Sequence, residues 1–348
     1  MSPPSHRHID GFHLVETLVE KGRAELESVL AEVLCHAEQE LTITAVQDLK
    51  KTRVVRIDYV KNCDAGSVVA KRLTSHGARG EQSALRHWLP VVGLQAIAIR
   101  LLAHVDFDDG ASAWHVYEDL GDWSLAGRST TPDEVSIALA AVARLHRESV
   151  DHPVLEECRA KGADRGMSFY ETFVRRALCG LESLDELPSH FGAIRARLLE
   201  HFHTLDAQGA SRAEHMIEFG GPDVLLHGDL WTGNVFVLPG ATGFSARLID
   251  WDKSGVGSAV YDLSAFLSRY SPADRPWVLA AYRASRYDWQ LPNDRELNRL
   301  FETVEHARIA NAITWIAEAC ADPAAQWAFE RLDELSTWVA PIEPMLAG

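Results

Sequence analysis

Acidic and amide side chains occur in two small groups within one strand-rich segment of the sequence, residues 224–252. Asp229 follows an apolar run, and Asn234 comes five residues after it. Asp250 and Asp252 follow a second apolar run. Oxygen atoms of these types are ligands that Mg²⁺ accepts, with phosphate oxygens and water completing its octahedron. A carboxylate beside such ligands can also remove a proton from a hydroxyl group, so the segment carries the groups that phosphoryl transfer requires.

The spacing of the two groups predicts that a hairpin brings them together. Two short apolar runs flank a turn predicted over residues 239–245, which contain two glycines. If Leu238 pairs with Ala246, Asn234 lies opposite Asp250 at the open end of the hairpin. An amide oxygen and a carboxylate would then meet next to the loop that carries the candidate base.

A lysine and a glutamate further upstream are candidates for nucleotide binding. Lys71 ends the strand pattern of residues 68–71, and Glu81 is the only acidic residue between Lys71 and Asp106. Glu81 is predicted to open the next helix. Phosphoryl transfer needs a cation that holds the nucleotide phosphates, and an ion pair from Glu81 would aim Lys71 at them. The alternative for Lys71 is a solvated lysine at a strand edge.

The elements that must position these residues begin with a small sheet. Hydrophobic periodicity predicts a helix over residues 12–36, a strand from 41, strands over 53–60 and 66–73, a helix over 81–89, and strands near 97–104 and 113–119. This order describes a small sheet with a single helix laid on it, preceded by an N-terminal helix.

The second part of the chain reads as mainly helical. Thr131 and Pro132, with Glu134 three residues after the threonine, form a helix start with a capping box. The later helical patterns cover residues 168–206 and 294–340. We therefore predict an α+β protein with a nucleotide-binding lobe over residues 1–119 and a catalytic and acceptor-binding lobe over residues 120–348.

Composition limits the partners and the setting of the protein. The chain has 348 residues and a formal net charge of −16, without a basic cluster, so nucleic acid is not predicted as a partner. No apolar run approaches the roughly 20 residues that a membrane span needs. The five cysteines form no CxxC pair and the first residues lack the apolar core of a secretory signal, so we predict a cytoplasmic protein with reduced thiols. The sequence does not indicate an oligomeric state.

These motifs, in this order, resemble those of the aminoglycoside phosphotransferase and choline kinase superfamily, which is related to the protein kinases. The resemblance covers roughly residues 41–270. The residues that carry it are Lys71, Glu81–Leu85, Tyr117–Gly121, Leu145-His146, His227-Gly228-Asp229, Asn234, Ile249–Asp252 and Tyr261-Asp262-Leu263. The resemblance implies a bilobal protein-kinase-like fold, with a small antiparallel sheet and one helix in the N-terminal lobe and a larger, mainly helical C-terminal lobe.

The resemblance also implies a role for the matched residues of the catalytic segment. Asp229 would be the catalytic base, and Asn234 and Asp250 would bind Mg²⁺. Asp252 would reach a second metal ion or the acceptor. Lys71 would contact the α- and β-phosphates of ATP.

Further nucleotide contacts are implied for the residues around position 117. Backbone groups of Tyr117, Glu118 and Leu120 would bind the adenine edge, and Val69 would line the ring pocket. His146 and Asp262 are expected to hold in place the loop that carries Asp229. The ring of His227 is expected to have a structural role in that loop.

The sequence departs from the family pattern in the turn between the first two strands. Residues 47–53 contain no glycine, although many relatives have a glycine or serine there that contacts phosphates through backbone N–H groups. Thr52, Lys50 or Lys51 would have to take this role. The resemblance implies ATP as the donor, and this departure leaves GTP open.

The acceptor is predicted only as a small molecule with a hydroxyl group, such as an aminoglycoside, an amino alcohol or a sugar-like metabolite. A cationic acceptor would suit four acidic residues of the helical region, Glu171, Glu302, Glu305 and Glu318. Four tryptophans are either core residues, which we favour for most of them, or an acceptor platform: Trp231, Trp315, Trp327 and Trp338.

Two functions of other classes compete with a kinase. The glycine-free turn suits a pseudokinase or partner-binding module, which would bind nucleotide without turning it over. A metal-dependent phosphoesterase would use His227, Asp229, Asp250 and Asp252 as ligands. Such sites usually hold more histidines than this segment offers.

Overall fold

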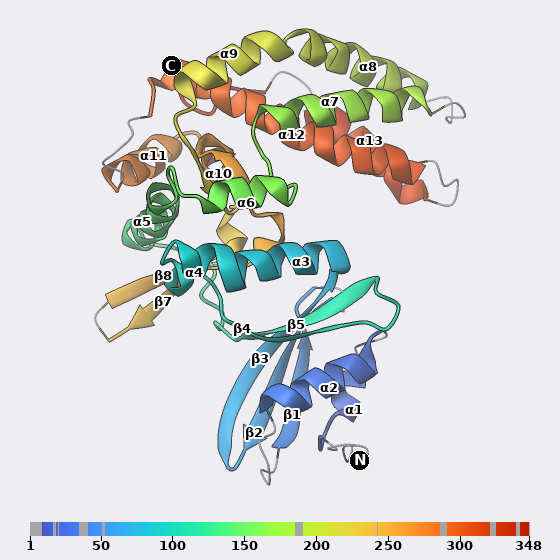
Figure 1. The fold of residues 1–348 in the computed structure, drawn as a ribbon, viewed down its shortest axis with the longest axis vertical. Coiled ribbons are helices and arrows are strands. Elements are labelled where there is room, and N and C mark those ends of the chain that lie inside the picture. The colour runs from blue at the N-terminus through green and yellow to red at the C-terminus, as the bar shows by residue number, and fades with distance from the viewer. Residues whose placement is uncertain are drawn as a thin grey trace. The chain divides into compact units, whose positions relative to one another are not determined.

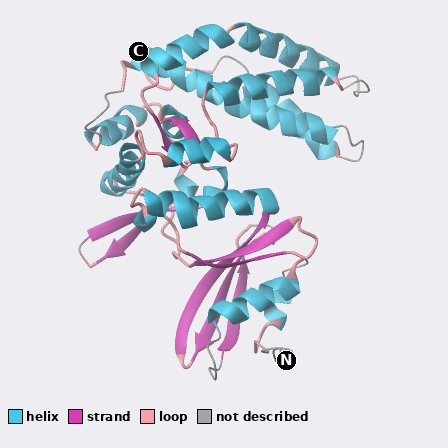
Figure 2. Ribbon diagram, in the orientation of Figure 1, coloured by secondary structure: helices cyan, strands magenta, loops and turns pink. Residues whose placement is uncertain are grey.

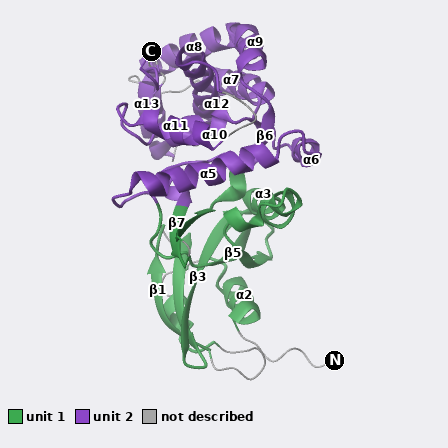
Figure 3. Ribbon diagram, turned by 90° about the vertical axis from the view of Figure 1, so that its left-hand side faces the viewer, with its two compact units in different colours: residues 1–124, 236–253 green, residues 125–235, 254–348 purple. Residues whose placement is uncertain are grey.

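The computed structural model describes residues 9–16, 19, 21–34, 41–50, 53–184, 191–241, 243–285, 291–320, 325–338 and 342–347. Contacts between residues divide the chain into two compact units (Figure 3). Unit 1 comprises Met1–Ser124 and Phe236–Lys253, and unit 2 comprises Leu125–Val235 and Ser254–Gly348. This division differs from the predicted lobes, because the segment from Phe236 to Lys253 belongs to unit 1 although it lies within the predicted C-terminal lobe.

Unit 1 is built on a five-stranded antiparallel sheet with the strand order β1-β2-β3-β5-β4 (Figures 1 and 2). The strands are β1 (Leu41–Asp48), β2 (Val54–Lys61), β3 (Asp64–Thr74), β4 (Leu101–Asp106) and β5 (Ser112–Glu118). Val55 and Ile57 of β2 are fully buried, as their alternation predicts, in a cluster that includes Trp114 of β5. β4 begins later than predicted, because Gln95–Ile97 form a 3-10 turn ahead of it.

Among the described residues ahead of the sheet, two helices stand in place of the single helix predicted over residues 12–36. They are α1 (His13–Glu16) and α2 (Arg23–Leu34). Gly22 has a positive φ of 72°, which lies outside the right-handed helical region and ends any continuous helix there. Leu26, Val29 and Leu30 of α2 are buried in the same cluster as the sheet.

The helix that carries Glu81 begins earlier than predicted. It consists of α3 (Ser75–Ser83), followed by a π-helical turn (Ala84–Trp88) and by α4 (Leu89–Val91). The hydroxyl of Thr74 caps α3 by accepting the N–H of Gly77 at 3.2 Å, so Glu81 lies inside the helix and does not open it. Gly77 and Gly80 conceal this helix in the sequence, because glycine disfavours helices. A Cβ on Gly80 would lie 3.1 Å from the backbone oxygen of Asp252, so glycine permits this close approach.

The predicted hairpin is present, and its strands are β7 (Val235–Gly240) and β8 (Gly243–Leu248). The turn predicted over residues 239–245 is too long, because the strands continue through Gly240 and resume at Gly243. Pro239 fits inside β7 because a two-stranded sheet has only edge strands, where a missing N–H is tolerated. The N–H of Ile99 donates to Leu248 at 2.9 Å, which ties β8 to the rest of unit 1. The placement of Asn234 opposite Asp250 stays a prediction.

Unit 2 is mainly helical, which confirms the predicted fold class. Its helices are α5 (Pro132–Glu148), α6 (Val154–Ala160), α7 (Met167–Glu182), α8 (Phe191–Ala207), α9 (Gly209–Phe219), α10 (Val260–Leu267), α11 (Arg275–Ala284), α12 (Asp294–Cys320) and α13 (Gln326–Trp338). β6 (Asp223–Leu226) pairs antiparallel with β9 (Gly255–Ser258). None of the helices in the described part of the chain combines the length and the apolar character needed to cross a membrane.

The start of α5 has the predicted capping box. The hydroxyl of Thr131 accepts the N–H of Glu134 at 3.3 Å, and the Glu134 carboxylate accepts the N–H of Thr131 at 2.8 Å. Thr131→Ala is expected to lower the free energy of unfolding by about 1 kcal/mol, because the helix loses this acceptor. Urea unfolding measures the change. Thr337→Ala, which removes an exposed hydroxyl near the end of α13, is the control, and an equal loss in both variants would contradict the capping role.

Candidate active site

The predicted site residues fall into two groups, one in each unit. The nucleotide-side residues Lys71, Glu81, Asp250 and Asp252 belong to unit 1, whereas Asp229 and its neighbour Asn234 belong to unit 2.

Lys71 lies on β3, directly opposite His115 of β5 in the ladder. Its ammonium group forms an ion pair with Asp250. Burial alone would lower the pKa of Lys71, but the charges of Glu81, Asp250 and Asp252 outweigh that effect and raise its pKa. Lys71 is therefore a protonated, shielded cation, and the alternative of a solvated strand-edge lysine is wrong.

Glu81 is fully buried, and its carboxylate is held by groups that we did not predict. The Nδ1 atom of His115 lies 3.1 Å from Oε2 of Glu81, and the hydroxyl of Tyr117 donates to the same oxygen. The backbone N–H of Trp251 donates to Oε1 at 3.2 Å. The predicted Glu81–Lys71 ion pair is wrong, because the lysine pairs with an aspartate and Glu81 acts on it only through its charge.

Asp250 and Asp252 form a dense negative group. Burial and the neighbouring charge of Asp250 raise the pKa of Asp252 to about 7. The buried Oδ1 atom of Asp252 has no hydrogen-bond partner. A buried carboxylate oxygen without a donor, next to a second carboxylate, favours a bound cation. The pair therefore fits Mg²⁺, which takes one or two carboxylates and completes its octahedron with phosphate oxygens and water.

The turn between β1 and β2 uses its described backbone donors internally. The N–H groups of Leu49, Lys50 and Arg53 donate to oxygen atoms of the chain at 2.8, 3.0 and 2.9 Å. Thr52 and Lys51, two of the three residues predicted as alternative phosphate contacts, lie outside the described residues. Because these N–H groups already have acceptors, they are poorly suited to bind the nucleotide phosphates.

The residues predicted to contact the nucleotide base lie at and after the end of β5. The side chain of Tyr117 points into the buried network around the glutamate of α3, and Val69 lies opposite Tyr117 in the ladder. The N–H of Glu118 donates to Arg100 at 3.2 Å, which keeps the strand paired to its end. Leu120 follows in the loop beyond β5. The roles of these residues toward the base stay predictions.

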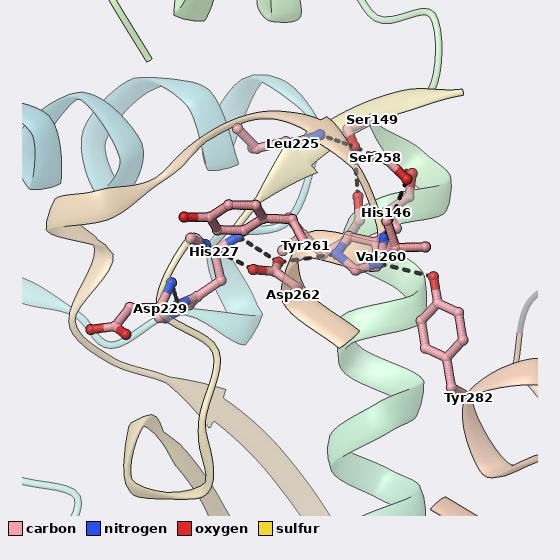
Figure 4. Close-up of polar contacts among 12 residues, drawn as sticks. His146, Ser149, Leu225, His227, Asp229, Ser258, Val260, Tyr261, Asp262 and Tyr282 are labelled. Atoms are coloured by element: carbon pink, nitrogen blue, oxygen red, sulfur yellow. Dashed lines mark hydrogen bonds and ion pairs between the residues drawn. The ribbon is translucent and has the colours of Figure 1, made fainter. Parts of the chain in front are cut away.

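The loop that carries Asp229 is anchored on one buried carboxylate (Figure 4). Asp262 accepts the N–H groups of His227 at 2.8 Å and of Gly228 at 2.9 Å. The Nε2 atom of His146 lies 3.2 Å from the same carboxylate. Burial alone would raise the pKa of Asp262, but its bonds to His146 and to the loop outweigh that effect and lower its pKa. The predicted supporting role of His146 and Asp262 is confirmed.

The anchored loop directs Asp229 and Asn234. Gly228 has a φ of 82°, a conformation that favours glycine, and the carboxylate of Asp229 points away from Asp262 (Figure 4). The N–H of Asp229 donates to Nδ1 of His227 at 3.3 Å, so the histidine ring has the predicted structural role. The amide nitrogen of Asn234 donates to the backbone oxygen of Asp229 at 2.9 Å. This bond fixes the amide and leaves Oδ1 as the side-chain atom suited to a metal ion.

Arg308 of α12 is a neighbour of the site that the sequence did not reveal. Its guanidinium group lies 4.0 Å from the ring centroid of Tyr261 and forms an ion pair with Glu305. Burial alone would lower the pKa of Arg308, but surrounding negative charges, among them Glu305 and Asp229, outweigh that effect and raise its pKa. A protonated arginine therefore acts on the candidate base through its charge. Arg308 belongs to no motif, and only the packing of α12 places it there.

Three of the four acidic residues predicted to attract a cationic acceptor are already paired with arginine. The pairs are Glu171–Arg175, Glu302–Arg212 and Glu305–Arg308. Paired carboxylates attract a further cation only weakly. These residues therefore give little reason to expect a cationic acceptor.

Three of the four tryptophans considered for the acceptor are surface residues. Trp315, Trp327 and Trp338 are 65%, 59% and 49% exposed, so core packing is the wrong interpretation for them. Their contribution to an acceptor platform stays a hypothesis.

Asp262→Asn is expected to lower the free energy of unfolding by about 2–4 kcal/mol. An amide offers one acceptor oxygen where two backbone N–H groups and a histidine converge, so a buried donor is left unsatisfied. Denaturant unfolding measures the change. Asp133→Asn, on the exposed first turn of α5, is the control and should change stability by less than about 0.5 kcal/mol. Equal midpoints for wild type and Asp262→Asn would contradict the anchoring role.

Solved structures of small-molecule kinases share this fold. An ethanolamine kinase from Plasmodium vivax is 13% identical with a TM-score of 0.59, over 92% of this chain and 88% of that chain. An aminoglycoside phosphotransferase from Streptomyces rimosus, in complex with ADP and streptomycin, is 15% identical with a TM-score of 0.53, over 83% and 99%. A choline kinase from Streptococcus pneumoniae is 14% identical with a TM-score of 0.51, over 92% and 100%. These similarities confirm the predicted kinase-like architecture.

A match to a family model defines the protein more closely. The model of the phosphotransferase enzyme family matches residues 59–301, which is more than half of the chain. The chain therefore belongs to the phosphotransferase enzyme family, and it is a small-molecule kinase by class. No curated protein sequence matches the chain closely enough to narrow this class further.

Proposed function

We propose that the protein transfers the γ-phosphoryl group of ATP to a hydroxyl group of a small molecule, with Mg²⁺ as cofactor and Asp229 as base. The main support for this function is the loop of unit 2 that carries Asp229 and is anchored on Asp262. Asp262 holds the two residues before Asp229 through their N–H groups, and the Asp229 carboxylate points away from this anchor (Figure 4). A carboxylate held in this way can accept the proton of a bound hydroxyl.

In the proposed reaction, Asp229 takes the hydroxyl proton while the acceptor oxygen forms a bond to the γ-phosphorus. The bond between that phosphorus and the β–γ bridging oxygen breaks, and ADP leaves. Lys71, which is protonated, would hold the α- and β-phosphates. Arg308 would add positive charge near the base.

Asn234, Asp250 and Asp252 are the residues that we propose hold Mg²⁺. The fixed amide of Asn234 and the unpartnered oxygen of Asp252 support this assignment. When bound, the ion would neutralise charge on the phosphates of the donor. Backbone groups of Tyr117 and Leu120 would bind the nucleotide base.

The acceptor that we propose is a hydroxyl-bearing molecule of the size of an aminoglycoside, an amino alcohol or a sugar. Proteins with the same fold support this range, since they include kinases for ethanolamine and choline and a phosphotransferase bound to streptomycin. We place the reaction in the cytoplasm, in line with the reduced cysteines predicted from the sequence.

The proposal is tested by nucleotide consumption. Purified protein with Mg²⁺ and ATP is assayed for ADP against pools of aminoglycosides, amino alcohols, glycated amines and neutral sugars, and GTP replaces ATP in a parallel series. Turnover that depends on one pool supports the proposal and identifies the acceptor class. Tight binding of Mg-ATP with no turnover on any pool would favour the pseudokinase alternative, which the engaged N–H groups of the β1–β2 turn support.

A further inference from the structure

Unit 1 contains a buried polar network that none of the predicted roles requires. Glu81, His115 and Tyr117 are 0%, 0% and 3% exposed. The Nε2 atom of His115 lies 3.1 Å from the amide nitrogen of Gln82. The Nδ1 atom of His115 lies 3.1 Å from Oε2 of Glu81 and 3.0 Å from the hydroxyl oxygen of Tyr117, and that hydroxyl donates to the same Oε2. The ring of His115 and the hydroxyl of Tyr117 thus meet at one carboxylate oxygen of Glu81.

The ladder between β3 and β5 explains why these side chains meet. Lys71 pairs with His115, and Val69 pairs with Tyr117, so the four residues share one face of the sheet. α3 lies against that face and presents Glu81 to it. Burial alone would raise the pKa of Glu81, but the hydrogen bonds from His115 and Tyr117 and the charge of Lys71 outweigh that effect and lower it. The carboxylate is therefore ionised and fixed in position.

The second oxygen of Glu81 reaches the segment that carries the candidate metal ligands. Oε1 accepts the backbone N–H of Trp251 at 3.2 Å, and the Trp251 side chain is fully buried. The residue before it, Asp250, has a left-handed backbone with a φ of 67°. A residue other than glycine in that conformation costs of order 1 kcal/mol or more, and persists only where its surroundings hold it. Glu81 supplies such a constraint on the peptide that follows Asp250.

We propose that His115 and the hydroxyl of Tyr117 are positioning residues for the metal site, and that they act through Glu81. They hold the carboxylate of Glu81, which binds the N–H of Trp251 and thereby keeps Asp250 in its left-handed conformation. The inference rests on the proposed function, because it takes Asp250 to be a ligand of Mg²⁺. In this arrangement the glutamate of α3 aligns the metal ligand, whereas Lys71 is aligned by its own ion pair with Asp250.

The first test compares nucleotide binding with and without the metal ion. Calorimetry of Tyr117→Phe should show about tenfold weaker binding of Mg-ADP, the effect of losing one hydrogen bond to a charged group, and less than about twofold change for ADP without metal. Tyr59→Phe removes a hydroxyl from β2 of the same sheet, outside the network, and is the matched control. Equal weakening for both forms of ADP, or none in a folded variant, would overturn the proposal.

A pair of substitutions at His115 separates positioning from packing. Asparagine can present an N–H near the place of Nδ1, whereas leucine only fills space. His115→Leu should weaken Mg-ADP binding about tenfold, and His115→Asn should recover part of that loss. Equal losses in two folded variants would show that the histidine acts through its volume alone and would overturn its assigned role.

The second test does not depend on nucleotide. Hydrogen exchange of the Trp251 amide should be about tenfold faster in Tyr117→Phe and Glu81→Gln than in wild type, because the acceptor of that amide is weakened. Unchanged exchange in both variants would overturn the link from Tyr117 to Asp250. If wild-type protein failed to bind Mg-ADP at all, the proposed function would fall, and the exchange result alone would decide whether Glu81 constrains this segment.

Discussion

Asp229→Asn is expected to lower turnover by about 10²–10⁴-fold, the range that a general base contributes. The amide retains the shape of the side chain, and the N–H groups that anchor the loop come from His227 and Gly228, so the fold and the binding of Mg-ATP should be unchanged. Steady-state kinetics of acceptor-dependent ADP formation measure the first effect, and calorimetry with Mg-ATP measures the second.

Asp223→Asn is the matched control for this substitution. Asp223 lies at the exposed start of β6, the strand that leads into the same loop, and pairs with Arg159 on the surface. Its turnover should stay within about twofold of wild type, because surface ion pairs contribute little. Turnover of Asp229→Asn equal to that of the control would show that another group takes the proton.

Asp250→Asn should remove the dependence of nucleotide binding on Mg²⁺. Substitutions that only touch metal ligands indirectly cost about 10–100-fold in metal affinity, so loss of a ligand should cost at least about 100-fold. The substitution also breaks the ion pair that holds Lys71, which should weaken the binding of the nucleotide phosphates by this lysine. Magnesium titrations of ADP binding and of turnover measure the effect.

Asp64→Asn, at the exposed start of β3, is the control for Asp250→Asn, because it removes the same charge from unit 1 far from any predicted ligand. A titration in which Asp250→Asn and the control respond to Mg²⁺ alike would contradict the role of Asp250 as a metal ligand.

Much of the fold follows from local patterns in the sequence. The alternation around Val55 and Ile57 predicts β2, and the capping box at Thr131 predicts the start of α5, because such signals depend on neighbouring residues alone. The helix of Glu81 begins earlier than predicted because Gly77 and Gly80 suppress the local helical signal. A tertiary contact explains a glycine at position 80, because it lets α3 approach Asp252 closely. Such a contact cannot be detected in the hydrophobic periodicity of the sequence.

Tertiary contacts also limit how much of the candidate site can be predicted from the sequence. Asp229 and Asn234 are recognisable because their loop is one continuous motif, and the structure gives that loop the anchor that we expected on Asp262. The predicted partner of Glu81, Lys71, is wrong. His115 contacts Glu81 instead, because the pairing of β3 with β5 brings it there, and that pairing depends on strand register. Arg308 was missed because it belongs to no motif and is placed by helix packing.

The proposed function requires that a small hydroxyl compound is phosphorylated and that Asp229 makes this possible. The most direct test is mass spectrometry of acceptor pools after incubation with Mg-ATP and either wild-type protein or Asp229→Asn. We predict a phosphorylated acceptor in one pool with wild type and a yield lower by about 10²-fold or more with the variant at equal times. A phosphorylated product formed equally by both proteins, or no product in any pool from wild-type protein that binds Mg-ATP, would contradict the account.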